Sequence, residues 1–175
     1  MNKKVKWIAE TAVLLALLVV LQAVTKAGGQ YLTGSCVNLI LGIAALVAGL
    51  WSGVTVAVLS PFFAFLLGIG PQNLAIIPAI SLGNLVLVVV LHLLARRAQG
   101  PIWKRGLAVV AAAGVKALVL YLVVVQLLCT LLSLPEQQVG LFTAMFSWPQ
   151  AVTALIGGTL AMLLAPVIRK GLKHD

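Results

Sequence analysis

The chain has 175 residues, of which 62% are hydrophobic and only 9% are charged, and its mean hydropathy is +1.17. This composition excludes a soluble domain, which could not cover so much apolar surface, and indicates an integral membrane protein. The formal net charge of +9 does not indicate nucleic-acid binding, because the cations fall in short segments beside apolar runs, where they contact anionic headgroups.

Most of the cations lie on one side of a repeated apolar pattern. Ten of the twelve lysines and arginines form three groups, before the first apolar run, between the middle runs and after the last run. The groups are Lys3, Lys4 and Lys6; Arg96, Arg97, Lys104 and Arg105; and Arg169, Lys170 and Lys173. Because basic loops stay in the cytoplasm, this pattern predicts that both termini are cytoplasmic.

Six apolar runs, separated by glycine, proline and polar residues, predict one all-α bundle of six transmembrane helices over residues 1–175. The helices are expected at about 7–24, 36–50, 54–67, 74–95, 106–132 and 141–167. The first run is longer than a signal-peptide core and no small-x-small cleavage site follows it, so we expect a retained helix. Six spans place the loops 25–35, 68–73 and 133–140 outside, and the turn 51–53 and the segment 96–105 inside.

The second and third runs are short for a bilayer. Each has about 15 residues, or about 22 Å of helix, against a hydrocarbon core of about 30 Å. Two short helices joined by the turn at 51–53 and a re-entrant pair are both compatible with the same topology.

Lys116 is the most informative polar residue inside an apolar run. It falls near the middle of the fifth predicted helix, where a lysine costs about 2.5–3.5 kcal/mol on membrane-insertion scales. Two interpretations stay open. Lys116 forms an ion pair with Glu10, the only acidic residue within a predicted span, or it lines a cavity and contacts a ligand.

Other polar residues gather in the half of the bundle that faces outside. The fifth predicted helix has polar residues at i, i+3, i+4 and i+7, a spacing that predicts one inward-facing stripe. These residues are Gln126, Cys129, Thr130 and Ser133. Together with Asn38, Asn73, Trp148 and Gln150, they predict an outward-facing pocket for a small, partly polar molecule. Ser81 and Asn84 share a face of the fourth predicted helix, where Asn84 could hydrogen-bond a substrate. Trp148 has an alternative role as an interfacial anchor, and Asn84 as a contact between helices.

Three further features bear on packing and on metal binding. His92 is expected at the cytoplasmic interface and not in a metal site, because no second ligand stands at a suitable spacing. The sequence predicts no metal and no cofactor. Cys36 and Cys129 are interpreted as two thiols, not as a disulfide. Small residues at every fourth position of the last helix predict close helix packing; they are Thr153, Gly157, Ala161 and Ala165.

The chain resembles the substrate-binding S component of energy-coupling factor (ECF) vitamin transporters. The resemblance rests on the size, the six helices and the cytoplasmic termini. It also rests on AVLLA at 12–16, TGSCVNL at 33–39 and GLWSG at 49–53. It implies a protein of the prokaryotic cell membrane that captures a vitamin or related micronutrient from outside. No signature selects one vitamin.

The same resemblance implies partners and site residues. Uptake would be powered by a transmembrane coupling (T) protein and two cytoplasmic ATPases, and Ala12 and Ala16 would face the T protein. The pocket would be built from the loop after the first helix and the outer parts of helices four to six. Those regions contribute Gln30, Tyr31, Ser81, Asn84, Gln126, Thr130, Trp148 and Gln150.

Two alternatives come from other functional classes. A solitary secondary transporter needs an intramembrane acid, for which Glu10 is the only candidate. A small intramembrane enzyme needs an acid–base pair, and the three acids and two histidines are not clustered. We therefore do not expect an enzyme.

Overall fold

The computed structural model describes residues 2–97 and 102–172, and this part of the chain is helical with no strand. The main helices are α1 (Lys3–Thr25), α2 (Gly29–Ile43), α3 (Leu50–Leu66), α4 (Ile77–Arg97), α5 (Ile102–Leu120), α6 (Cys129–Leu131), α7 (Glu136–Phe146) and α8 (Trp148–Gly171). Short 3₁₀ turns are η1 (Lys26–Gly28) and η3 (Leu74–Ile76), and π-helical segments are η2 (Ala44–Ala48) and η4 (Tyr121–Leu128). The side chains of Arg96 and Arg97, and residues 98–101 and 173–175, lie outside the described part.

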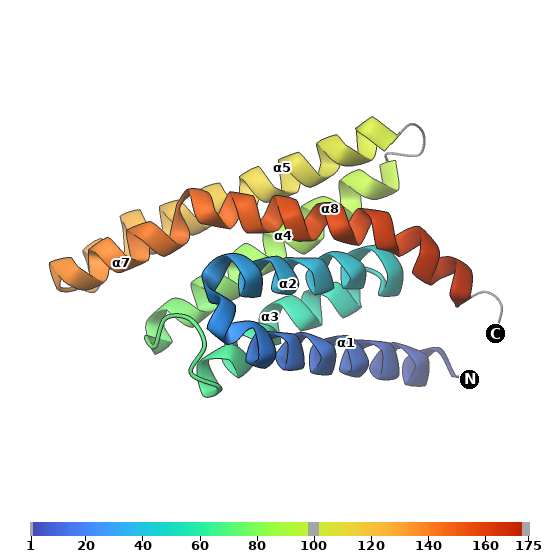
Figure 1. Ribbon diagram of the computed structural model, residues 1–175, viewed down its shortest axis with the longest axis horizontal. Coiled ribbons are helices and arrows are strands. Elements are labelled where there is room, and N and C mark those ends of the chain that lie inside the picture. Colours follow the sequence, from blue (N-terminus) through green and yellow to red (C-terminus); the bar gives the residue numbers. More distant parts are fainter. Residues whose placement is uncertain (1, 98–101, 173–175) are drawn as a thin grey trace.

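The helices run back and forth in one bundle (Figure 1). In the core of the bundle, α8 packs against α2 and α5, while α4 packs against α3 and α5. The start of α1 and the end of α8 lie at the same end of the bundle. We call this the basic end, because it holds Lys3, Lys4, Lys6, Lys104, Arg105, Arg169 and Lys170. The opposite end, called the far end, holds the turn η1 and the segments 67–73 and 132–135.

Length and composition identify a membrane protein. Four helical stretches are long and apolar enough to cross a bilayer: Lys3–Ala48, Leu74–Ala95, Ile102–Leu131 and Glu136–Gly171. The first contains α1 and α2, which fold back on each other at η1, and α3 is a shorter apolar helix. Large apolar side chains such as Val24, Leu66 and Val167 lie exposed on the outside of the bundle, as lipid contact requires.

Two helix boundaries differ from the prediction because of single glycines. The loop predicted at 25–35 is mostly helix. Gly29 has φ +75°, and α2 begins there. The turn predicted at 51–53 lies two residues earlier, at Gly49 with φ +103°, and residues 51–53 belong to α3. Only a residue that tolerates positive φ can reverse the chain so tightly, and the sequence offers several glycines for that role.

The last apolar run is also not one helix. α7 begins at Glu136, so the loop predicted at 133–140 is largely helical, and the chain breaks at Ser147 before α8. Pro149 lies in the first turn of α8, where its missing N–H costs nothing but where it cannot continue α7. The break gives α7 a separate position at the far end (Figure 1).

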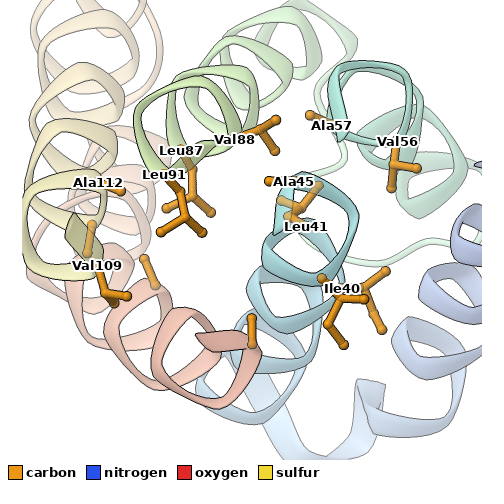
Figure 2. Packing of buried hydrophobic residues seen from close by; sticks show 14 of the residues in the cluster. Ile40, Leu41, Ala45, Val56, Ala57, Leu87, Val88, Leu91, Val109 and Ala112 are labelled. Atoms are coloured by element: carbon orange, nitrogen blue, oxygen red, sulfur yellow. The ribbon is translucent and has the colours of Figure 1, made fainter. Parts of the chain in front are cut away.

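The core is built on close contact between α2 and α8. A Cβ atom added to Gly157 would lie 2.5 Å from the Ser35 carbonyl oxygen and 2.6 Å from the Leu39 nitrogen. One turn on, a Cβ on Gly42 would lie 2.5 Å from that of Ala161. The predicted packing role of Gly157 and Ala161 is therefore confirmed. Figure 2 shows larger buried residues filling the remaining space, among them Ile40, Leu41, Val56, Leu87, Val88, Leu91 and Val109.

Candidate functional site

A cavity of about 290 Å³ opens at the far end of the bundle. Its wall combines side chains from α1, α2, α3, α4, α5, α7 and α8, together with the segment before α4. The polar side chains that line it are Gln22, Lys26, Gln30, Asn38, Asn84, Lys116 and Gln150, with Thr33 beside them. Five of the residues predicted to bind substrate therefore line this cavity: Gln30, Asn38, Asn84, Lys116 and Gln150.

The only charged side chain buried in this cavity, among the described residues, is that of Lys116, which is 2% exposed. Its Nζ donates hydrogen bonds to Asn38 Oδ1 at 2.6 Å and to Asn84 Oδ1 at 2.8 Å. Asn38 Nδ2 in turn donates to Thr153 Oγ1 at 3.2 Å. Four helices, α2, α4, α5 and α8, are thus joined by one buried polar cluster.

The ion pair considered between Lys116 and Glu10 is wrong. Glu10 lies near the basic end, where its carboxylate is 3.8 Å from Lys6 Nζ. One helical turn separates these two residues, so the local pair forms on the surface of α1 and leaves Lys116 to the asparagines. Of the two interpretations, the cavity-lining cation agrees with the structure.

Close packing explains how Asn38 reaches Lys116. Gly34 and Gly42 lie one turn before and after Asn38 on the same face of α2, and both contact α8. Because neither has a side chain, the two helix backbones approach closely. The Asn38 amide then spans the space between α8, through Thr153, and α5, through Lys116.

Two glutamines from distant parts of the chain meet at the far end of the cavity. Gln30 Nε2 and Gln150 Nε2 both donate to the Met145 carbonyl oxygen, at 2.6 Å and 3.0 Å. This carbonyl belongs to the last turn of α7, where helical partners are missing. The break before α8 therefore supplies the acceptor that fixes both amides at the cavity wall. Lys26 is exposed beside them and donates to the Leu67 carbonyl oxygen at 3.4 Å.

Three predicted residues lie elsewhere. Ser81 is buried, but its hydroxyl donates to the Val58 carbonyl oxygen at 3.0 Å and so joins α4 to α3. Tyr31 and Trp148 are exposed, and their ring centroids lie 5.9 Å apart outside the cavity lining. The exposure of Trp148 fits its alternative role as an interfacial anchor.

The predicted inward-facing stripe of the fifth run is wrong for Gln126 and Thr130. Both are exposed and outside the cavity lining, and Gln126 Nε2 donates to Tyr121 Oη at 2.9 Å. The cause is the π-helical segment η4, whose i→i+5 turns interrupt the period on which the stripe depended. Cys129 from the same stripe is buried and, like Cys36, is a free thiol, which confirms that interpretation.

Gln22, Lys26 and Thr33 line the cavity but were not predicted as site residues, and Gln22 is the most buried of the three. It is only 5% exposed, and its Oε1 is a buried atom without a hydrogen-bond partner among the described residues; Ser60 Oγ is the other such atom. Of these two residues, only Gln22 lines the far-end cavity. The available signal was a glutamine inside the apolar run of the first helix.

A second, larger cavity of about 700 Å³ lies at the basic end, between η2, α4, α5 and α8. His92 is buried there and its Nδ1 donates to the Ala45 carbonyl oxygen at 2.8 Å. Its expected position at the cytoplasmic interface stays a prediction. Arg169 donates to the Leu46 carbonyl oxygen. Over the described residues, neither cavity brings together three side chains of the kinds that bind a metal.

A comparison with protein families matches residues 6–169 to the family described as the substrate-specific component of ECF transporters. The chain belongs to this family. Its resemblance to an S component is thereby confirmed over nearly the whole chain. The family is a transporter component and not an enzyme family, and its members work with a T protein and ATPases. No curated protein and no solved structure matches the chain.

Proposed function

We propose that this S component captures a vitamin or related micronutrient in the far-end cavity, for uptake powered by a T protein and two cytoplasmic ATPases. One observation carries the proposal. The cavity reaches a cluster of Lys116, Asn38 and Asn84 that is buried in the middle of a membrane bundle. Intramembrane polar groups are costly and commonly mark substrate sites. Family membership supports substrate binding as the role of the chain.

The charge pattern supports one orientation in the membrane. Cations at the basic end favour a cytoplasmic location, with both termini inside and six spans formed by α1, α2, α3, α4, α5 and α8. The far-end cavity then opens to the outside of a prokaryotic cell. A cysteine at Gln72 should react with an impermeant maleimide in intact cells, and one at Leu172 only after permeabilisation. Labelling of Leu172 in intact cells would refute this orientation.

The proposed docking surface is the face of α1 that carries Ala12 and Ala16. Both alanines are exposed, while Leu18 and Gln22 turn inward on another face of the helix. Small exposed side chains let a partner helix approach closely. This arrangement supports the T protein as the partner of α1.

A solitary transporter is less well supported. Its coupling acid would be Glu10, but that carboxylate is partly exposed, near the basic end and beside Lys6. The far-end cavity has no acidic lining residue among those described. The surface position of Glu10 and the lack of an acidic side chain in the described cavity lining both favour a transporter that is powered by partner subunits.

Substrate binding can be tested with one matched pair of variants. Asn84→Leu should abolish retention of the small molecule that native mass spectrometry detects on the purified chain, because Asn84 lines the cavity and holds Lys116. Gln126→Leu should retain it, because Gln126 is exposed outside the cavity. Equal loss in both variants, or full retention in Asn84→Leu with an intact fold, would place substrate elsewhere.

A further inference from the structure

The chemistry of the far-end cavity specifies its ligand more closely, given that the proposed function holds. In its ionised form, Lys116 has no acidic partner among the described residues. An ammonium group has three N–H donors, and Asn38 and Asn84 accept two hydrogen bonds. Neutral amide oxygens solvate the ammonium but leave its charge uncompensated, and a buried charge normally has an ionic partner.

No carboxylate of the described chain can serve as that partner. The protein has three acidic residues in all. Glu10 lies beside Lys6, Glu136 is exposed at the start of α7, and Asp175 falls outside the described residues. Neither Glu10 nor Glu136 lines the cavity. Among the described residues, none supplies a counter-charge for an ionised Lys116, and a bound anion would supply it.

The geometry around Lys116 favours a carboxylate as this counter-charge. Lys116 donates to Asn84 Oδ1, and the hydrogen bonds found among the described residues include none donated by Asn84 Nδ2. The third N–H of Lys116 and the amide of Asn84 together offer two donors in one small region. Two donors and a single positive charge match the two oxygens and single negative charge of a carboxylate.

Gln22 adds a second, independent requirement. Its Oε1 is buried and unpartnered, and the residue lines the same cavity from α1. An unsatisfied buried acceptor costs about 1–3 kcal/mol, which a ligand N–H or O–H would recover. Apolar side chains form much of the remaining wall, among them Pro61, Ala64, Ile77, Ile80 and Phe146. The volume of about 290 Å³ lies near the lower limit for small-molecule sites.

We infer that the substrate is a small organic carboxylate with an apolar body and one hydrogen-bond donor. The carboxylate binds Lys116 Nζ and Asn84 Nδ2 at the buried end of the cavity. The donor binds Gln22 Oε1, and the apolar part contacts the wall between them. This assignment rests on the proposed function and adds the chemical class of the substrate.

The first experiment uses a low-molecular-weight extract of the cells that encode the protein. The extract is divided by anion exchange at neutral pH into an anionic fraction and a flow-through, and each is added to the purified full chain. The anionic fraction should raise the melting temperature by about 5 °C or more, because a ligand stabilises the state that binds it. Stabilisation by the flow-through alone would overturn the inference and leave the proposed function standing. No stabilisation by either fraction would overturn both.

The second experiment separates carboxylates from phosphates. Methyl esterification of the anionic fraction should abolish the melting shift, because an ester has no charge for Lys116. Phosphatase treatment of the same fraction should leave the shift unchanged. Loss of the shift after phosphatase would overturn the carboxylate assignment. Both treatments act on the ligand, so the result does not depend on whether any variant folds.

Variants then locate the group that binds. Lys116→Met should weaken the response to the anionic fraction by about 30-fold or more in the concentration required. Lys104→Met removes the same charge at the basic end and should leave the response unchanged. Gln22→Leu should weaken binding while raising the melting temperature without ligand, because it removes the unpartnered oxygen. An unchanged response in Lys116→Met would overturn the inference.

Discussion

The two cavities of this S component differ in what their basic side chains contact. At the basic end, His92 and Arg169 donate to the carbonyl oxygens of Ala45 and Leu46, in the π-helical segment that ends α2. Carbonyls at a helix end have no helical partner, so these side chains stabilise the backbone itself. At the far end, Lys116 contacts only the side-chain oxygens of two asparagines.

This difference shows why volume alone does not identify a binding site. The basic-end cavity is more than twice as large, at about 700 Å³ against 290 Å³. Two of its polar side chains, His92 and Arg169, already donate hydrogen bonds to backbone carbonyl oxygens just after α2. The smaller cavity has hydrogen-bonding groups without a partner among the described residues: one N–H donor on Lys116 and one acceptor oxygen on Gln22. A site for a ligand needs such unused groups at a place where water is excluded.

The largest expected effect comes from the wall that both cavities share. α8 lines both cavities, whereas α2 lines the far-end cavity and the following segment η2 lines the basic-end cavity. Gly157 allows the close contact between α2 and α8. Gly157→Leu should destabilise the fold by about 3 kcal/mol or more and abolish binding, because backbone atoms of α2 occupy the space for its side chain. The midpoint of denaturant unfolding in detergent measures the loss.

A matched control exists on α5. A Cβ on Gly114 would meet nothing within 4 Å, and the residue is exposed. Gly114→Leu should therefore be neutral or slightly stabilising, since glycine is a poor helix former. If Gly157→Leu folds as well as Gly114→Leu, the α2–α8 contact does not hold the two cavities in place.

The second-largest effect is expected on uptake, while the far-end cavity stays intact. If the T protein docks on α1, Ala12→Trp or Ala16→Trp should abolish ATP-dependent uptake and reduce co-purification of the partner, because a large side chain blocks close approach. Binding of substrate by the isolated chain should persist. Leu118→Trp, at an exposed apolar position on α5, serves as the control. Normal uptake with tryptophan at both alanine positions would refute docking on this face.

Much of the fold could be predicted from apolar patterning, because a bilayer requires long apolar helices. The runs predicted at 7–24 and 74–95 lie within α1 and within η3 and α4. The breaks were harder to predict. Nothing local distinguishes Gly29 and Gly49, which have positive φ, from Gly34 and Gly53, which lie inside helices. Tertiary packing decides which glycine reverses the chain.

The sequence predicted those site residues whose role depends on their depth in the membrane. Lys116 stood out because a lysine at mid-membrane needs compensation. The two glutamines show the limit of such reasoning. Gln22 and Gln126 both interrupt apolar runs, yet Gln22 is buried in the cavity while Gln126 is exposed. Their difference follows from the packing of α1 and from the π-helical turns of η4, neither of which the sequence pattern encodes.

The smallest expected effects come from the basic-end cavity and test the comparison directly. His92→Leu leaves the buried Ala45 carbonyl without its donor, which should cost about 1–3 kcal/mol of stability. Arg169→Gln should lower stability less, because Arg169 is exposed and water can replace its hydrogen bond to Leu46. Both variants should bind substrate as the wild type does, since neither residue touches the far-end cavity.

Unfolding midpoints and binding affinity should be measured together, with Asn84→Leu as the reference for lost binding. If His92→Leu weakened binding as strongly as Asn84→Leu while keeping its fold, the basic-end cavity would take part in substrate recognition. The distinction between basic side chains that complete a helix end and a lysine that binds a ligand would then be refuted.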